Sequence, residues 1–151
     1  MTLTPGVFYK FTIQSRNAIG FSQGSSKLTV MAASIPNPPS NVVTQSGVTS
    51  VTVSWSAPVY NGGSVITAYN IVFQQSDGVT YTSSSDCNGA SSTVVSSLSC
   101  TILFSTLNSS PFNINWGGSI YAQVQAINYV GSSAFSTAGN GAIILTSPSA
   151  P

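Results

Sequence analysis

Ser50-Val51-Thr52-Val53-Ser54-Trp55 alternates strictly between polar and apolar residues. Successive side chains of a β-strand point to opposite faces, so this alternation predicts a half-buried strand whose apolar residues face a core. Residues 65–75 predict a longer strand, and Asp77-Gly78 predicts a hairpin turn into residues 79–83. Residues 120–128 and 141–146 show further β patterns, and no segment shows a convincing helical period. The sequence therefore predicts an all-β fold.

Two parts of the chain are related by an internal repeat with an offset of about 110 residues. Asn17-Ala-Ile-Gly20 returns as Asn128-Tyr-Val-Gly131, and the alternating residues of 9–17 fall on those of 120–128. The proline-rich residues 36–39 fall on residues 148–151 after one inserted position. We expect residues 1–35 to be the end of one repeat, residues 36–147 a complete repeat, and residues 148–151 the start of a linker. The chain then begins inside a repeat, as a fragment of a longer array.

Charged side chains are rare, at 3% of residues against about 25% in ordinary globular domains. The formal net charge is +1, which gives no basic field to hold nucleic acid or anionic lipid. No stretch approaches the roughly 18 apolar residues of a membrane helix, so we expect no membrane insertion in this segment. The low charge also weakens the repulsion between copies of the chain.

The residues that carry enzymatic chemistry are nearly absent. A Ser-His-Asp triad is impossible because the chain has no histidine, and Asp77 and Asp86 are its only side-chain carboxylates. The glycines at positions 62, 63, 117 and 118 precede no helix and make no phosphate-binding loop. The sequence therefore predicts neither catalysis nor a cofactor or metal.

Cys87 and Cys100 are the only cysteines. A zinc site would need further ligands and a nucleophilic cysteine would need a base. We therefore expect a disulfide between Cys87 and Cys100, with a pair of free structural thiols as the alternative. A disulfide would stabilise the fold by about 3 kcal/mol and would place the chain in an oxidising compartment.

The order and spacing of several motifs resembles a fibronectin type III domain: Pro38-Pro39, Ser50–Pro58, Asn61-Gly-Gly-Ser64 to Tyr69, and Gln125-Ala-Ile-Asn128-Tyr-Val-Gly131. Leu3-Thr-Pro-Gly6 to Tyr9 resembles the end of a preceding domain of this kind. The resemblance implies a fibronectin type III or immunoglobulin-like antiparallel β-sandwich, preceded by the last two strands of another. It implies seven strands, which we assign to residues 40–46, 49–56, 65–75, 79–83, 100–107, 118–128 and 141–146.

The resemblance also implies roles for particular residues. Trp55 is expected in the core between the sheets, and the core assignment extends to Tyr69, Ile71 and Val124. Tyr9 resembles the tyrosine of the corner, whose hydroxyl bonds to the backbone. The aligned position in the complete repeat is Ile120, so that bond is lost there or supplied by a neighbouring tyrosine, Tyr121. Residues 86–111 form a longer segment than usual, which we interpret as an insertion tied by the cysteines.

Three residues are candidates for surface roles. Asn108-Ser-Ser110 is an N-glycosylation sequon, which we expect in an exposed loop, against the alternative of a simple loop asparagine. Tyr60 and Trp116 fall in loops, where they are candidates for contact with sugars or partners. Packing against the end of the sandwich is the alternative for both.

Two functions fit these observations. The first is a structural module of an extracellular tandem array that builds a coat, stalk or fibre, with other copies or neighbouring repeats as partners. The second is an adhesion or receptor ectodomain that binds a protein or glycan through residues 59–64, residues 128–136 or an edge strand. A lone hairpin is marginal in water, so we expect residues 1–35 to be completed by a preceding segment or by another copy. Both functions imply secretion to the cell surface or beyond.

Overall fold

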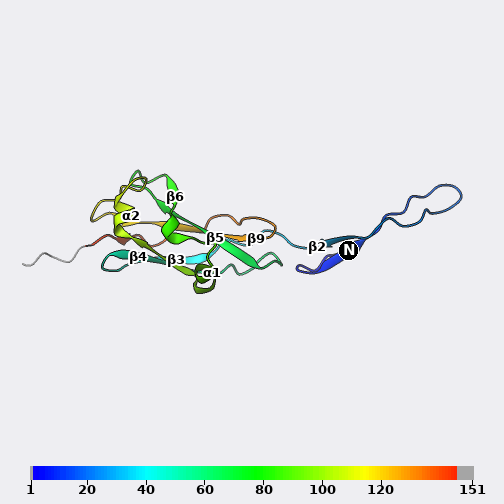
Figure 1. Ribbon diagram of the computed structural model, residues 1–151, viewed down its shortest axis with the longest axis horizontal. Coiled ribbons are helices and arrows are strands. Elements are labelled where there is room, and N and C mark those ends of the chain that lie inside the picture. Colours follow the sequence, from blue (N-terminus) through cyan, green and yellow to red (C-terminus); the bar gives the residue numbers. More distant parts are fainter. Residues whose placement is uncertain (1, 146–151) are drawn as a thin grey trace, which may run out of the picture.

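The computed structural model describes residues 2–145, most of which form an antiparallel β-sandwich (Figure 1). One sheet has the order β3 (Ser40–Ser46), β4 (Ser50–Ser56) and β7 (Ser99–Leu103). The other has the order β6 (Tyr81–Ser83), β5 (Ile66–Gln74) and β9 (Ala122–Asn128). The short strands β8 (Ser119–Ile120) and β10 (Ala142–Ile143) pair with each other. The prediction of an all-β sandwich is confirmed.

The alternation that predicts β4 is also its burial pattern. Val51, Val53 and Trp55 are buried while the residues between them are not. In β5 a register shift lies between Ile66 and Ala68, after which every second residue from Tyr69 to Phe73 points into the core. The two sheets therefore contribute opposing apolar faces, which is the arrangement that stabilises a sandwich.

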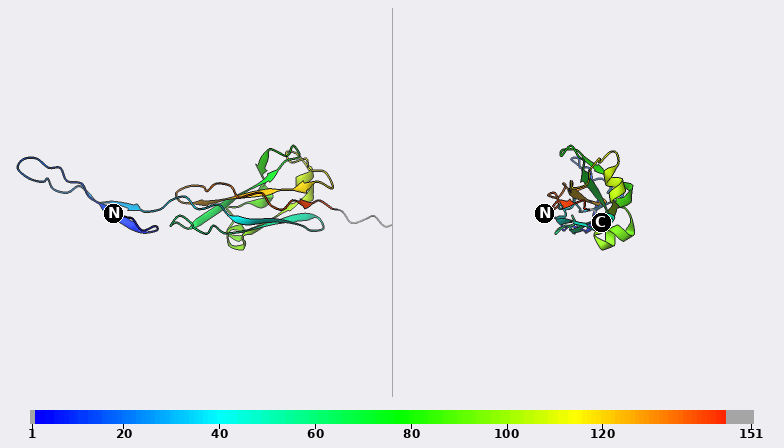
Figure 2. Two further views of the ribbon diagram at one scale, coloured as in Figure 1. Left: turned by 180° about the vertical axis from the view of Figure 1, so that it is seen from behind. Right: turned by 90° about the vertical axis from the view of Figure 1, so that its left-hand side faces the viewer.

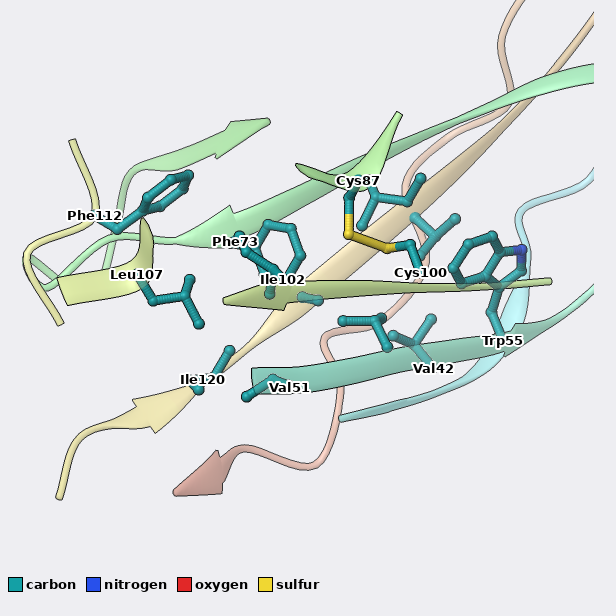
Figure 3. Packing of buried hydrophobic residues seen from close by; sticks show 14 of the residues in the cluster. Val42, Val51, Trp55, Phe73, Cys87, Cys100, Ile102, Leu107, Phe112 and Ile120 are labelled. Carbon is teal, nitrogen blue, oxygen red and sulfur yellow. A yellow bond between two sulfur atoms is a disulfide. The ribbon is translucent and has the colours of Figure 1, made fainter. Parts of the chain in front are cut away.

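The core fills the space between these sheets, and Figure 3 shows how its side chains meet. The structure places the four predicted core residues there: Trp55, Tyr69, Ile71 and Val124. The rings of Trp55 and Tyr69 meet edge to face with centroids 5.2 Å apart. Such aromatic pairs add stabilisation beyond the area that they bury.

Residues 2–35 form a hairpin that projects away from the sandwich (Figures 1 and 2). Its strands are β1 (Phe8–Phe11) and β2 (Leu28–Met31), paired antiparallel. Phe11 and Ile13 are 45% and 77% exposed, whereas their counterparts in the repeat, Ala122 and Val124, are fully buried. The hairpin thus exposes the face that the sandwich buries in the complete repeat.

The segment between β6 and β8 differs from the prediction. Strand β7 ends at Leu103, and the helix α2 (Phe104–Asn108) takes up the rest of the predicted strand 100–107. Residues 86–111 are not wholly an insertion, because β7 pairs with β4 inside the sheet. The 3₁₀ helix η1 (Ser85–Cys87) and the helix α1 (Ser92–Ser97) were not predicted. Each of these helices spans less than two turns, too few residues to show a helical period.

The last strands are also shorter than predicted. The predicted strand 118–128 is divided at Tyr121 into β8 and β9, since β8 leaves the larger sheet to pair with β10. Strand β10 covers two of the residues predicted at 141–146, and residue 146 lies outside the described residues. The predicted end of the repeat at residue 147 and the linker at residues 148–151 lie outside them as well.

The turn between β5 and β6 gives a pH prediction. The Asp77 carboxylate accepts hydrogen bonds from the Thr80 hydroxyl and from the backbone N–H groups of Val79 and Thr80. These bonds, that of the Thr80 hydroxyl first, lower the pKa of Asp77. A lowered folded pKa stabilises the turn above the unfolded pKa, and this contribution is lost as the pH falls through the folded value.

We therefore expect an NMR titration of the Asp77 carboxyl to have its midpoint below that of the same residue in a short unfolded peptide. The amide signals of Val79 and Thr80 should shift with the same midpoint. Asp77→Asn, which has no titrating group there, is the control and should remove the transition. Equal midpoints in the folded chain and the peptide would contradict the prediction.

Candidate functional site: the joint between hairpin and sandwich

The hairpin meets the sandwich at a joint made of Pro5, Gly6, Ser34, residues 61–63 and Asn128. Four separate parts of the chain converge here: the turn before β1, the linker after β2, and two loops at one end of the sandwich. The contacts between them are backbone hydrogen bonds, one buried amide side chain and close glycine packing. The joint therefore depends on backbone geometry more than on side-chain charge.

Asn128, the last residue of β9, is at the centre of the joint and is 4% exposed. Its Nδ2 donates to Ser34 O at 2.7 Å and to Asn61 O at 2.9 Å. Its Oδ1 accepts from the N–H groups of Val130 at 2.9 Å and Gly131 at 3.1 Å. One amide therefore connects the linker and two loops, with each of its polar atoms bonded twice. Burial of an amide is favourable only when its hydrogen bonds are made in this way.

The linker is also bonded to the loop that follows β4. Ser34 donates its N–H to Gly62 O at 2.8 Å, and Asn37 donates to Tyr60 O at 2.9 Å. Pro36 between these two bonds has a restricted φ, which reduces the backbone freedom that the joint must lose on ordering. The linker is thus bonded to the sandwich on both sides of a proline.

Gly62 and Gly63 are required by both conformation and space. Their φ angles are +77° and +74°, a region that L-residues with side chains rarely adopt. A Cβ at position 62 would lie 2.0 Å from Ser34 O. A Cβ at position 63 would lie 2.6 Å from Gly6 N and 2.7 Å from Pro5 Cβ. The two glycines therefore allow the backbones of hairpin and sandwich to touch.

An apolar groove runs along one side of the joint. Its volume is about 700 Å³, and its lining includes Phe8 and Met31 from the hairpin and Val65 and Tyr129 from the sandwich. Phe8, Val65 and Tyr129 are 66%, 76% and 88% exposed. This groove is the apolar surface that hairpin and sandwich share.

The hairpin and the sandwich use the same asparagine turn. Asn17 Oδ1 accepts from the N–H groups of Ile19 at 2.9 Å and Gly20 at 3.0 Å, as Asn128 Oδ1 does two and three residues further along its own turn. Asn17 N donates to Gly20 O at 3.0 Å, and Asn128 N donates to Gly131 O at the same distance. The sequence repeat is therefore also a repeat of hydrogen bonds.

The correspondence extends to the residues that precede each asparagine turn. Ser22 donates its N–H to Ser15 O at 2.8 Å, and its hydroxyl accepts from Ser15 N at 2.9 Å. Ser133 makes the same pair of bonds with Ala126 at 2.8 and 3.0 Å. Serine hydroxyls thus take the place of backbone carbonyls in the ladder. The same two bonds recur one step further on, between Ser25 and Ile13 and between Ser136 and Val124.

Tyr9 forms the corner bond that its motif predicts. Its hydroxyl accepts a hydrogen bond from Thr4 N at 2.7 Å, and this bond lowers the pKa of the phenol. At the corresponding place in the complete repeat, Ile120 is fully buried. Among the described residues the Tyr121 hydroxyl makes no hydrogen bond, so Tyr121 does not replace Tyr9. At this corner Ile120 packs in the core of the sandwich instead.

Cys87 and Cys100 form a disulfide with a Cα–Cα distance of 5.4 Å, visible in Figure 3. It joins η1 to β7, and both cysteines are buried. Asp86 accepts a hydrogen bond from the Thr106 hydroxyl at 2.7 Å, a second contact between η1 and the segment after β7. The disulfide therefore fixes the helical segment against the outer strand of one sheet.

Asn108 does not lie in the exposed loop that the sequence predicts. It is the last residue of α2 and is half-buried, and its Nδ2 donates to Ile114 O at 2.8 Å. Its Oδ1 is buried without a protein hydrogen-bond partner. Because the nitrogen that a glycan would modify is already bonded inside the fold, the folded structure does not favour glycosylation here.

The structure separates Tyr60 and Trp116, the two predicted contact residues. Tyr60 is 39% exposed and lies beside the joint, where its carbonyl holds the linker. Trp116 is 57% exposed and packs edge to face on Phe104, with ring centroids 5.8 Å apart. The predicted contact loops at residues 59–64 and 128–136 meet at the joint, where residues 60–63 and Asn128 contact the linker and the hairpin.

Residues 2–145 show neither a cluster of metal ligands nor a membrane-spanning helix. No group of three or more His, Cys, Asp or Glu residues there is placed to hold a metal ion. Within the same residues, no helix has the length and apolar character needed to cross a bilayer.

Comparison with known proteins bears on the fold of the chain. No protein-family model matches the chain. Over 77 residues it is 32% identical to Kelch domain-containing protein SSO1033 of Saccharolobus solfataricus, and the match covers 51% of this chain and 11% of that protein. The chain therefore corresponds to about a tenth of that relative's length, and the relative's whole activity cannot be transferred to it.

Solved structures similar to the chain include regions of titin and of twitchin. Domains A168–A170 of titin match with a TM-score of 0.61 and 22% identity, over 91% of this chain and 40% of that one. Titin kinase with its flanking domains gives 0.56 and 22%, over 74% and 17%. The twitchin kinase region from C. elegans gives 0.57 and 19%, over 78% and 18%. These likenesses show that the chain contains an immunoglobulin or fibronectin type III-like β-sandwich.

Proposed function

We propose that the chain is a non-enzymatic structural module of an extracellular tandem array of fibronectin type III-like domains, which builds a surface coat, stalk or fibre. The observation that carries this proposal is the joint. A buried asparagine and two glycines with positive φ hold consecutive units in a defined orientation. Such an arrangement is useful where the spacing and direction of units matter.

The exposed face of the hairpin supports the tandem arrangement. Phe11 and Ile13 take the positions that Ala122 and Val124 occupy in the core of the complete repeat. Apolar side chains in these positions need a cover of further strands. The first five strands of a preceding repeat would supply it in the same way that β3 to β7 cover β9. A hairpin docked on another copy is the alternative arrangement.

The disulfide supports an extracellular location. Disulfides persist in oxidising environments, whereas cytosolic thiols are kept reduced. The low charge of the chain supports close association of arrays, since little electrostatic repulsion opposes it. Neighbouring repeats and other copies of the array are therefore the proposed partners.

Material from the natural source tests this function directly. Intact-mass measurement should give a chain much heavier than 15.5 kDa, and electron microscopy should show extended particles with a regular domain spacing. A mature mass near 15.5 kDa would contradict the covalent array. Dispersed compact particles would contradict the fibre or stalk.

Substitution of Gly62 tests the joint. Gly62→Ala should displace the linker, because the new Cβ would overlap Ser34 O. We expect faster hydrogen exchange of the Ser34 amide, which donates to Gly62 O, and greater motion of the hairpin relative to the sandwich in NMR relaxation.

Gly78→Ala is the matched control for this substitution. Gly78 has a φ of +72°, close to that of Gly62, but a Cβ there meets nothing within 4 Å. Both variants therefore carry the same backbone strain, of about 1 kcal/mol, and only one disturbs the joint. Equal exchange of the Ser34 amide in the two variants would contradict the proposed packing.

A second candidate function is an adhesion or receptor module, which the apolar groove favours. Phe8, Val65 and Tyr129 expose aromatic and aliphatic surface of the kind that holds sugars or protein segments. Screening the chain on a glycan array, beside a Tyr129→Ser variant, tests this function. Binding that Tyr129→Ser abolishes would support it, and the absence of specific binding would count against it.

A further inference from the structure

The turn that contacts the sandwich at the joint recurs at the opposite end of the sandwich. Gly6 N donates to Ala32 O at 2.7 Å, and Ala32 N donates to Val7 O at 2.9 Å. In the complete repeat Gly117 N donates to Ile144 O at 2.9 Å, and Ile144 N donates to Gly118 O at 3.0 Å. Gly6 and Gly117 have φ angles of +80° and +85°. The two turns are therefore the same structure at equivalent positions of consecutive repeats.

The two turns differ in what covers them. In the first, Pro5 and Gly6 pack against Gly63 of the following unit, and a Cβ at Gly6 would lie 3.1 Å from Gly63 O. In the second, a Cβ at Gly117 would meet nothing within 4 Å. Trp116 takes the position of Pro5 and is 57% exposed. The turn at Gly117 thus has the same form as the turn at Gly6, but no loop such as that of Gly63 packs against it among the described residues.

The Trp116 ring is oriented by the residues that it contacts. Its ring packs edge to face on Phe104 and borders an apolar cavity of about 540 Å³ that includes Val48 and Leu103. Both of those side chains are exposed, at 83% and 50%. Phe104 begins α2, which lies at the end of the sandwich away from the hairpin (Figure 1). The end of the sandwich opposite the joint therefore presents an oriented indole on apolar surroundings.

We propose that Trp116 and Gly117 form the docking surface for the Asn-Gly-Gly loop of a following repeat, the loop that corresponds to residues 61–63. The occupied version of this interface is already present in the chain, where Gly63 packs against Pro5 and Gly6. A loop with two glycines exposes backbone rather than side chains, which lets a flat indole approach closely. This inference rests on the proposed tandem array and names the residues that join each unit to the next.

A fusion of two repeats tests this docking. Residues 1–151 are followed by a second copy of residues 40–151, because residues 148–151 correspond to the linker residues 36–39. Trp116→Phe in the second copy leaves one exposed indole, since both copies of Trp55 are buried at 5% exposure. Acrylamide quenching of tryptophan fluorescence then reports the exposure of Trp116 in the first copy.

We expect the quenching constant to fall severalfold from the 151-residue chain to the fusion. Gly63→Ala in the second copy should restore it, whereas Gly78→Ala in the second copy, with similar backbone strain and no contact, should leave the indole protected. Circular dichroism would check that each variant is folded. Unchanged quenching in the folded fusion would overturn the proposal, as would protection that survives Gly63→Ala.

Different results would contradict the docking at Trp116 and the tandem array. If the natural chain has a high mass but Trp116 is not protected in the fusion, the tandem array is still supported. Its units would then move freely at this end of the sandwich. A natural chain near 15.5 kDa would remove the array, whatever the fusion shows.

Discussion

Asn128→Asp is expected to destabilise the sandwich and its joint by about 3 kcal/mol near neutral pH. The substitution keeps an oxygen that accepts from Val130 and Gly131. It replaces the Nδ2 donor with a second oxygen, which would face the carbonyls of Ser34 and Asn61. A buried carboxylate beside two carbonyl oxygens loses two hydrogen bonds and gains repulsion.

The effect of Asn128→Asp depends on pH in a direction that follows from burial. Desolvation and the facing carbonyls disfavour the charged carboxylate, so the pKa of the new group in the folded chain lies above its unfolded value. The variant is therefore least stable, relative to the natural chain, above the folded pKa. It recovers as the pH falls, because the protonated acid can donate to one of the carbonyls.

Asn17→Asp is the matched control that the repeat supplies. Asn17 makes the same turn bonds through Oδ1, but its side chain is exposed and its Nδ2 has no partner within residues 2–145. We expect this variant to unfold within about 0.5 kcal/mol of the natural chain. Urea unfolding at several pH values measures both. Equal stability of the two variants at neutral pH would contradict the role assigned to Asn128.

The comparison of Asn17 with Asn128 also shows what the sequence predicts well. Alternation in residues 50–55 fixes which side chains are buried, since the two faces of a strand have separate environments. The repeat fixes which residues correspond, and the hydrogen bonds follow that correspondence along the whole hairpin edge. Strand positions and core residues are therefore accessible from local pattern.

The joint was harder to predict because it depends on contacts between distant segments. The sequence shows that Gly62 and Gly63 allow unusual backbone angles, but not that Ser34 and Pro5 lie against them. The sequence shows Asn128 only as a turn residue. Its counterpart Asn17 makes only the turn bonds in the structure. The role of Asn128 in the joint depends on the position of the linker, which the sequence does not show.

The helices η1 and α1 escaped prediction for a different reason. The helix α1 consists of serine, threonine and valine, none of which favours a helix strongly, and its C-cap residue, Leu98, has a φ of +54°. Its position is set by the chain on both sides: Cys87 and Cys100 are joined, and Gly89 packs against the backbone of Tyr69. Tertiary constraint here outweighs local preference.

That constraint leads to the second large effect, which is expected on loss of the disulfide. Replacing both Cys87 and Cys100 with alanine should lower the free energy of unfolding by about 3 kcal/mol, since the bond closes a short loop that the unfolded chain would otherwise leave free. The loss of two buried sulfur atoms from the core adds to this effect. Thermal and urea unfolding, with and without reductant, measure it.

The reductant itself supplies the control for this prediction. Reduction should destabilise the natural chain toward the level of the double alanine variant and should leave the variant unchanged. A natural chain equally stable when reduced would show that the helical segment is held by packing alone, and it would remove the main support for an oxidising, extracellular location. If instead the reduced chain loses α1 and η1 while β3, β4 and β5 persist, hydrogen exchange will show protection confined to the sandwich. The disulfide would then act on the segment between β6 and β7, and the joint that precedes β5 would keep its hydrogen bonds.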